Sequence, residues 1–185
     1  MENFFTLRNL RQFTNQFMNF LKSPVNSNWT PKLKEGDDYR NSIVIRKRNH
    51  HLYVYDDNGN VVYHIPVATG RVSGQRQQAN DSRTPVGSFS INSHTTKADT
   101  DTFGHNLHYG LHIPAGENYP AGSGFAIHGD ANNPDSIGTN ASHGCIRCNN
   151  GDLEKLHEIL GGRKAIGKKV YILDEKDNYK SGGTI

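Results

Sequence analysis

The fold of this chain is decided around two short stretches, FAIHGD at residues 125–130 and ASHGCIRC at residues 141–148. The second stretch places Cys145 next to His143 and Arg147, and the first supplies His128. A neighbouring cation, or the N-terminus of a following helix, lowers the pKa of a thiol from its ordinary value of about 8.5 and produces the nucleophilic thiolate. Either histidine can take the thiol proton and return it to a leaving amine. The residue types therefore suit acyl transfer through a thioester.

Two other residues of the second stretch suit the same chemistry. Gly144 leaves the backbone free to present N–H groups toward a developing oxyanion. The guanidinium group of Arg147 can bind a substrate carboxylate through two parallel hydrogen bonds. We therefore expect both residues to lie in the site.

Three other interpretations of Cys145 remain open. The residue could be a buried and inert cysteine. It could form a redox pair with Cys148, although such pairs open a helix in a βαβ context that this chain does not show. Finally, Cys145, Cys148, His128 and His143 could bind zinc, although the second half of a typical zinc motif is absent.

Short β-branched and aromatic runs predict a mostly-β domain. The expected strands cover residues 43–45, 52–55, 61–65, 89–91, 108–113, 124–128 and 169–173. The sequence DNGN at 57–60 predicts a hairpin turn. Residues 70–83 and 92–103 show no apolar period, and we expect them to form long loops. One short helix follows Cys148; Asn150 or Asp152 can cap it, and Gly161 ends it.

Residues 1–22 predict an amphipathic helical arm, because Leu10, Phe13, Phe17, Phe20 and Leu21 recur at spacings of three and four. Pro24 ends this helix. A linker at 23–41, a main domain at 42–174 and a polar tail at 175–185 complete the predicted organisation. The arm could pack on its own domain, dock on a partner or lie on a membrane surface.

Length, charge and hydropathy limit the function classes. The chain has 185 residues, which predicts one main domain at roughly 150 residues per domain. Its net charge of +3 is dispersed, which argues against a nucleic-acid partner. No run approaches the length of a transmembrane helix, and we see no signal peptide. The two cysteines, Cys145 and Cys148, are too close in sequence to link distant parts of the fold.

From about Ser42 to Leu173, the chain resembles the YkuD-type L,D-transpeptidases of bacterial peptidoglycan metabolism. The resemblance rests on His128-Gly129 followed by the string SHGCIR at 142–147. VATG at 67–70 and TPVGSF at 84–89 are similar to two further strand-and-turn pieces of that family. The implied fold is a sandwich-like mixed β-sheet with one short helix after the catalytic cysteine.

The resemblance implies a role for each matching residue. Cys145 is expected to be the nucleophile that attacks the amide after the third residue of a stem peptide and releases D-Ala. His128 is expected to act as general base and then as acid, oriented by the backbone carbonyl of Gly129. His143 is expected to line the site, where it binds substrate or polarises the thiol.

The remaining matches imply supporting roles. Ser142 and Gly144 are expected to shape the turn and the oxyanion pocket, and Arg147 to support the site electrostatically. Tyr109 and the loop 92–103 fall where the family has a substrate-covering flap. The resemblance implies no metal and no organic cofactor. Transfer of the acyl group to a second stem's amine gives a 3→3 cross-link, whereas transfer to water makes an L,D-carboxypeptidase.

The sequence departs from the family pattern at two positions. Asp130 stands where Thr or Ser is common, and we expect it to alter the preference for the acceptor. Cys148 stands where an apolar residue is usual; it either packs in the core or forms a reversible disulfide with Cys145. The remaining histidines are expected on strand faces and loops, and the strand of His112 leads toward the site. These are residues 50, 51, 64, 94, 105, 108 and 112.

These observations predict a cysteine-dependent L,D-transpeptidase that acts at the bacterial cell wall or periplasm. Without a visible export signal, we expect delivery by a phage virion or a secretion system, with the N-terminal arm docking on that machinery. The alternatives are a peptidoglycan-targeting toxin or phage-associated hydrolase, and a non-catalytic virion or wall-binding protein with the same fold. The presence of Cys145, His128 and Arg147 argues against the last, because binding alone needs no nucleophile.

Overall fold

The computed structural model describes residues 38–78, 80–96, 107–112, 124–130 and 133–174. The N-terminal helix and polar tail predicted from the sequence lie outside these residues. The described strands are β1 (Ser42–Arg46), β2 (His51–Tyr55), β3 (Val61–Pro66), β4 (Thr69–Gly70), β5 (Gly87–Thr95), β6 (His108–His112), β7 (Phe125–Gly129), β8 (Asn140–Ser142), β9 (Ile146–Cys148) and β10 (Lys169–Leu173). The described helices are α3 (Asn150–Leu160) and the 3-10 turns η2 (Lys47–Asn49), η3 (Pro134–Ser136) and η4 (Gly162–Ala165).

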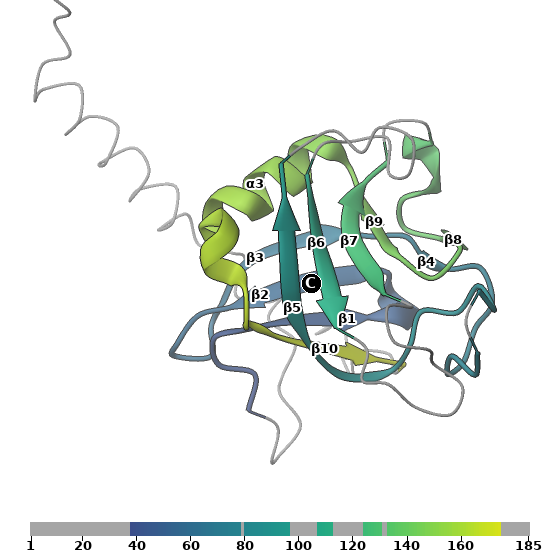
Figure 1. The fold of residues 1–185 in the computed structure, drawn as a ribbon, viewed down its shortest axis with the longest axis horizontal. Helices are drawn as coiled ribbons and strands as arrows, with labels where there is room; N and C mark the ends of the chain where they lie inside the picture. The colour runs from purple at the N-terminus through teal and green to yellow at the C-terminus, as the bar shows by residue number, and fades with distance from the viewer. Residues whose placement is uncertain (1–37, 79, 97–106, 113–123, 131–132, 175–185) are drawn as a thin grey trace, which may run out of the picture. The chain divides into compact units, whose positions relative to one another are not determined.

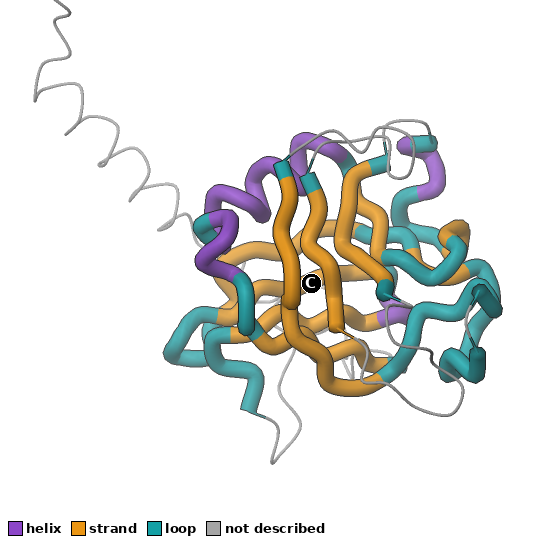
Figure 2. The backbone as a smooth tube through the Cα atoms, in the orientation of Figure 1, coloured by secondary structure: helices purple, strands orange, loops and turns teal. Residues whose placement is uncertain are grey.

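Eight of the described strands form one mixed sheet in the order β3-β2-β1-β10-β5-β6-β7-β9. The pairs β1–β10 and β7–β9 are parallel, and the other neighbours in this sheet are antiparallel. Strands β4 and β8 form a separate parallel pair. Figure 1 shows β5, β6 and β7 crossing in front of β1, β2 and β3, and Figure 2 shows the same strands in orange. This arrangement confirms the predicted sandwich-like mixed sheet.

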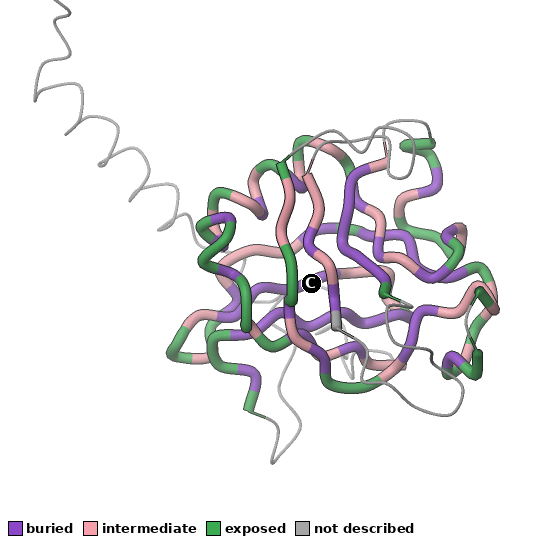
Figure 3. The backbone as a smooth tube through the Cα atoms, viewed as in Figure 1, coloured by how far each residue is buried: buried purple, intermediate pink, exposed green. Residues whose placement is uncertain are grey.

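The main core lies between the two crossing layers. Ile43 and Ile45 of β1 face this core, whereas Val44 belongs to a second cluster on the other face of the same strand. Every residue of β1 and of β7 is buried, and both strands run among the buried segments in Figure 3. A strand buried on both faces is expected to be continuously apolar, as IVI at 43–45 and FAI at 125–127 are.

Helix α3 covers one side of the main core. Leu153, Leu156 and Leu160 recur along one stripe of the helix and are buried in that core. Gly161 ends the helix with a positive φ of 71°, in the left-handed conformation that glycine adopts readily. The helix and its stop were therefore predicted correctly, whereas its cap was not: the N-cap residue is Asn149, and Asn150 and Asp152 lie within the helix.

Loop lengths were predicted less well. Residues 92–95, expected in a loop, continue β5, whose ladder with β6 is shifted between Ile91 and Ser93. The polar run Asn92–Thr95 lacks the apolar signal of a strand because its side chains are not fully buried. The short strands β4, β8 and β9 were also missed as strands, since two or three residues carry no periodicity.

Candidate active site

Strands β7 and β9 place the motif residues side by side. In this parallel pair, Ile127 lies opposite Ile146 and His128 opposite Arg147. Continuing the register by one residue puts Cys145, which immediately precedes β9, opposite Ala126. Because side chains alternate along a strand, His128 and Arg147 share one face of the sheet. Cys145 directly precedes this strand, where its thiol has a backbone hydrogen bond with Ala126 and lies within the electrostatic influence of Arg147. The structure thus brings together the two residues expected to form the catalytic pair.

His128 is a buried, oriented imidazole, with 6% of its surface exposed. Its Nδ1 lies 2.6 Å from the carbonyl oxygen of Gly129, and because a carbonyl only accepts, Nδ1–H is the donor. Burial lowers the pKa of His128 to about 4; the charge of Arg147 acts in the same direction, whereas the Gly129 hydrogen bond and Asp130 oppose it. The ring is therefore neutral near pH 7 and carries its basic lone pair on Nε2.

Cys145 differs from the expected thiolate. Burial raises the pKa of its thiol, and this effect outweighs a backbone hydrogen bond from Ala126 and the positive charges of Arg147 and Arg76, which lower it. The expectation of a depressed thiol pKa was therefore wrong, because desolvation dominates over the neighbouring cations. The resting pair is a neutral thiol and a neutral imidazole, and deprotonation must accompany attack on the substrate.

The turn before Cys145 is held by Ser142. The buried Ser142 hydroxyl donates to the carbonyl oxygen of Cys145 at 2.6 Å and accepts from the N–H of Gly144 at 3.0 Å. The Gly144 N–H is therefore used within the turn that Ser142 and Gly144 were expected to shape.

A second hydroxyl fixes this turn from outside the motif. The buried Thr84 Oγ1 donates to the carbonyl oxygen of Gly144 at 3.0 Å and accepts from the N–H of Gly70 at 2.8 Å. Gly144 has a φ of 129°, and a Cβ there would lie 3.1 Å from the carbonyl oxygen of Arg83. At Gly70, a Cβ would lie 2.4 Å from the Ser82 carbonyl oxygen. These contacts explain in physical terms why VATG and TPVG accompany the cysteine motif.

Arg147 is paired with Asp130. Its Nη1 donates to Asp130 Oδ2 at 2.8 Å, while the N–H of Asn133 and the hydroxyl of Ser136 donate to the same carboxylate at 3.1 and 3.3 Å. Asp130 is thus occupied in holding the segment after β7 and the guanidinium beside His128. The structure favours electrostatic support for Arg147 over the bidentate substrate binding that the sequence suggested.

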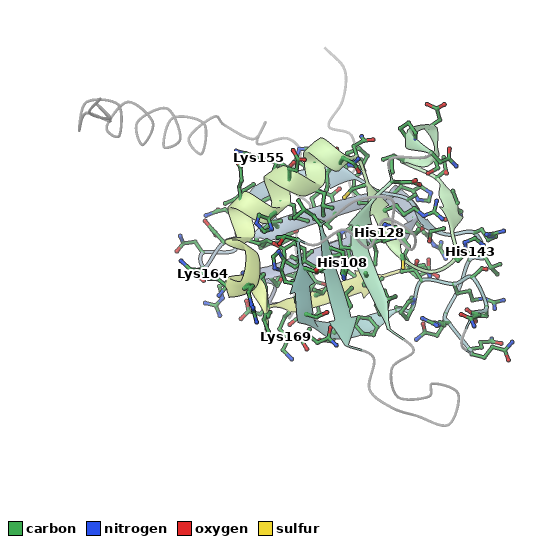
Figure 4. The ribbon with its side chains drawn as sticks, turned by 45° about the horizontal axis from the view of Figure 1, so that its top comes forward. His108, His128, His143, Lys155, Lys164 and Lys169 are labelled. Atoms are coloured by element: carbon green, nitrogen blue, oxygen red, sulfur yellow. The ribbon has the colours of Figure 1, made fainter. Side chains whose placement is uncertain are left out.

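His143 lies at the exposed rim of the site. A guanidinium N–H of Arg71 donates to its Nε2, and the backbone N–H of Arg71 donates to the carbonyl oxygen of Ser142 at 2.9 Å. These two contacts tie Arg71 to the rim of the site through Ser142 and His143. Figure 4 shows His143 set apart from His128.

Two predicted residues lie on the opposite face of the same strands. Tyr109 of β6 is paired with Ile127, is 1% exposed and packs its ring against His94 and His157. It does not reach the substrate side, so its assignment as a substrate-supporting residue is corrected. The prediction failed because the strand alternation between β6 and β7 turns Tyr109 into the core.

Cys148 also faces the core, where its thiol donates to the carbonyl oxygen of His128 at 3.5 Å. Cys145 and Cys148 are three residues apart on extended chain, about 10 Å between Cα atoms. A disulfide needs a Cα separation below about 7 Å. Both thiols are free, so packing replaces the disulfide and redox interpretations of Cys148. Within the described residues, no group of three or more His, Cys, Asp or Glu side chains is placed to hold a metal ion.

Sequence reasoning missed His108 in the site. His108 of β6 is paired directly with His128 of β7, so both lie on one face (Figure 4), and its charge lowers the pKa of His128. The strand of His112 was the one expected to approach the site; its backbone pairs with Ser90, and its side chain lies outside the described part of the structure. The alternation of side chains along β6 could have shown that His108 and Tyr109 face opposite sides of the sheet. It could not show which of them faces His128, because the register between β6 and β7 does not follow from the local sequence.

Comparisons with known proteins agree with this geometry. The sequence model of the YkuD L,D-transpeptidase catalytic domain matches residues 40–172. Among curated proteins, the sequence search finds no match. No helix within the described residues is long and apolar enough to cross a membrane.

Solved structures share the fold at low sequence identity. The helical cell shape determining protein Pgp2 from Campylobacter jejuni is 20% identical with a TM-score of 0.58, over 89% of this chain and 57% of that one. An L,D-transpeptidase from Mycobacterium tuberculosis H37Rv is 20% identical (TM-score 0.51, 72% and 57%). An L,D-transpeptidase from Xylanimonas cellulosilytica is 21% identical (TM-score 0.52, 75% and 62%).

The chain thus spans less than two thirds of each of these structures. The family match, in contrast, covers most of the chain and includes both strands that position His128 and Cys145. This chain belongs to the YkuD family of L,D-transpeptidase catalytic domains.

Proposed function

We propose that this protein is a cysteine-dependent L,D-transpeptidase that acts on peptidoglycan stem peptides through a thioester acyl-enzyme, at the bacterial cell wall or periplasm. The observation that supports the proposal is the pairing of β7 with β9, which sets Arg147 opposite His128, with Cys145 two residues before Arg147 and hydrogen-bonded to the backbone of Ala126. The hydrogen bond from His128 Nδ1 to Gly129 orients the ring with its proton on Nδ1 and its basic lone pair on Nε2. Family membership supports the substrate class.

In the first half-reaction, Cys145 Sγ attacks the carbonyl carbon of the third stem residue while its proton moves to His128 Nε2. We expect the backbone N–H of Cys145 to bind the developing oxyanion, because it belongs to the attacking residue itself. His128 then returns the proton to the nitrogen of the departing D-Ala, the C–N bond breaks, and the thioester remains. A neutral imidazole is required at the start, which the low pKa of His128 provides.

In the second half-reaction, the side-chain amine of another stem attacks the thioester. His128 takes a proton from this amine and returns it to the Cys145 sulfur, which gives a 3→3 cross-link. The same base can activate water, and the enzyme then acts as an L,D-carboxypeptidase. The two activities share every step up to the thioester, so only the products separate them.

The test measures the intact mass of the protein after incubation with a tetrapeptide stem or a carbapenem. We expect an acyl adduct on the wild-type protein, none on Cys145→Ala, and an undiminished adduct on the matched control Cys148→Ala. Adding an amine acceptor should convert the tripeptidyl adduct into a cross-linked product, whereas product formed with water alone identifies carboxypeptidation. A folded protein with a free Cys145 thiol and no adduct from either reagent would contradict the proposal.

A further inference from the structure

An arginine-rich segment, residues 71–83, lies along the turn that carries the nucleophile. The carboxylate of Asp81 organises it by accepting from the backbone N–H groups of Gln77 and Arg83 at 2.8 and 3.0 Å. The side chain of Gln75 closes it, since its Oε1 accepts from the Val86 N–H at 2.6 Å. The segment is therefore a shaped wall of the site, although its sequence predicts only a loop.

The arginines of this wall differ in their partners. Arg83 is paired with Asp81 at 3.1 Å, as Arg147 is with Asp130 at 2.8 Å. Arg71 is exposed and has no carboxylate partner among the described residues. Its backbone is tied to Ser142 and its guanidinium to His143, so its remaining N–H donors are held at the rim of the site.

Arg76 adds positive charge to the same wall. It is buried, with its Nε donating to the carbonyl oxygen of Gln78 at 3.2 Å. Its charge favours the thiolate of Cys145, in the same direction as Arg147, although burial outweighs both. The wall therefore combines the exposed guanidinium of Arg71, tied to Ser142 and His143, with the buried positive charge of Arg76.

We propose that Arg71, tied to the rim of the site by Ser142 and His143 and supported by the charge of Arg76, binds a free carboxylate of the acyl donor and makes the enzyme selective for negatively charged stems. This proposal rests on the proposed function. Guanidinium groups bind carboxylates through charge-assisted, often paired hydrogen bonds, and an uncharged amide loses most of that gain. The carboxylate is either the C-terminal one of the departing residue or a side-chain one of the stem.

The experiment compares three tetrapeptide donors: one with all carboxylates free, one amidated at the C-terminus and one amidated on its side-chain carboxylates. The rate of Cys145 acylation is measured for the wild type, Arg71→Gln, Arg71→Lys and the control Lys169→Gln. Lys169 is an exposed cation of β10, and Figure 4 shows it far from His143. Comparing ratios between donors within one variant cancels any general effect on folding or on the nucleophile.

We expect wild type and Lys169→Gln to acylate about tenfold to a hundredfold faster with the free donor than with one of the two amidated donors, which identifies the carboxylate. Arg71→Gln should abolish this preference, and Arg71→Lys should retain part of it. An equal ratio in wild type and Arg71→Gln, or no preference in the wild type, overturns the inference while leaving the proposed function intact. Failure of the wild type to react with any donor overturns both.

Discussion

The two faces of the β6-β7-β9 edge of the sheet are formed by alternate residues of the same strands. One face packs into the apolar core, and the other carries the candidate site. We call them the core face and the site face. The core face consists of Tyr109, Ile127, Ile146 and Cys148. The site face consists of His108, His128 and Arg147, and we group with it Cys145, which directly precedes β9.

The two cysteines show what this difference means. Cys148 is fully buried among apolar side chains, and burial raises the pKa of its thiol far above the ordinary value. Cys145 is partly exposed and has Arg147 and Arg76 to oppose the effect of burial. The two cysteines of the CIRC sequence therefore differ in burial and in neighbouring charge, and we expect Cys145 to be the more reactive of the two.

The largest contrast is expected between neighbouring residues of β7. His128→Gln removes the base of the site face, and we expect acylation of Cys145 to slow by a factor of about 10² to 10⁴ with little loss of stability. Ile127→Val on the core face should keep the acylation rate and lower the free energy of unfolding by about 0.5–1.5 kcal/mol. Stopped-flow measurement of acylation and denaturant unfolding of both variants test this difference. An equal loss of activity in His128→Gln and Ile127→Val would contradict the assignment of the two faces.

The site face also depends on a hydroxyl behind it. Thr84→Val removes a donor to Gly144 and an acceptor for Gly70 and leaves both backbone groups buried without their partner. We expect the free energy of unfolding to fall by about 2–3 kcal/mol and acylation to slow, because the turn before Cys145 loses its anchor. Thr84→Ser keeps the hydroxyl and should restore most of the activity. If Thr84→Val and Thr84→Ser have the same stability and acylation rate, the two hydrogen bonds of the Thr84 hydroxyl do not cause the loss.

The pH dependence separates a buried base from an ordinary histidine. Because burial lowers the pKa of His128 to about 4, the neutral base persists well below the usual 6.5. The acylation rate should therefore stay level from pH 7 to about 5 and fall about tenfold per unit below 4. Protonation in the unfolded state should also reduce stability between pH 6.5 and 4, so circular dichroism must accompany the rates. An acid limb near 6.5 would show that His128 is solvated during catalysis.

Cys148 tests the core face without touching the chemistry. Cys148→Ala should cost about 1 kcal/mol of unfolding free energy, since it removes one buried heavy atom and its hydrogen bond to the His128 carbonyl. In the wild type, a small alkylating reagent should modify Cys145 under native conditions and Cys148 only after denaturation. Modification of both thiols in the folded protein, followed by mass spectrometry, would contradict this assignment.

The sequence predicted features that depend on neighbouring residues. The hairpin turn near Gly59, the helix after Cys148 and its stop at Gly161 follow from local conformational preferences. The Nδ1 bond of His128 to the adjacent Gly129 carbonyl came from the family resemblance, and it too spans a single peptide unit. These predictions were confirmed because such features form without a specific register between distant strands.

The errors concern the register between distant strands. The pairing of β6 with β7 decides whether Tyr109 or His108 faces the site. The number of residues between the two strands does not show which residue of β6 lies opposite His128. The hydrogen bond from Thr84 to Gly144 joins residues that are 60 positions apart in the sequence, and Arg71 contacts His143 across 72 positions. The sign of the Cys145 pKa shift required the burial of the site, which residue types alone do not supply.

The smallest expected effect comes from Tyr109, the core-face residue that sequence reasoning placed in the site. Its hydroxyl is buried with no hydrogen-bond partner among the described residues, and burial raises its pKa to about 12. Tyr109→Phe removes this polar atom while keeping the ring against His94. The unfolding free energy should stay the same or rise by about 1 kcal/mol, and the acylation rate should not change. A loss of activity at unchanged stability would contradict the assignment of Tyr109 to the core face, because such a loss would indicate that its hydroxyl contacts the substrate.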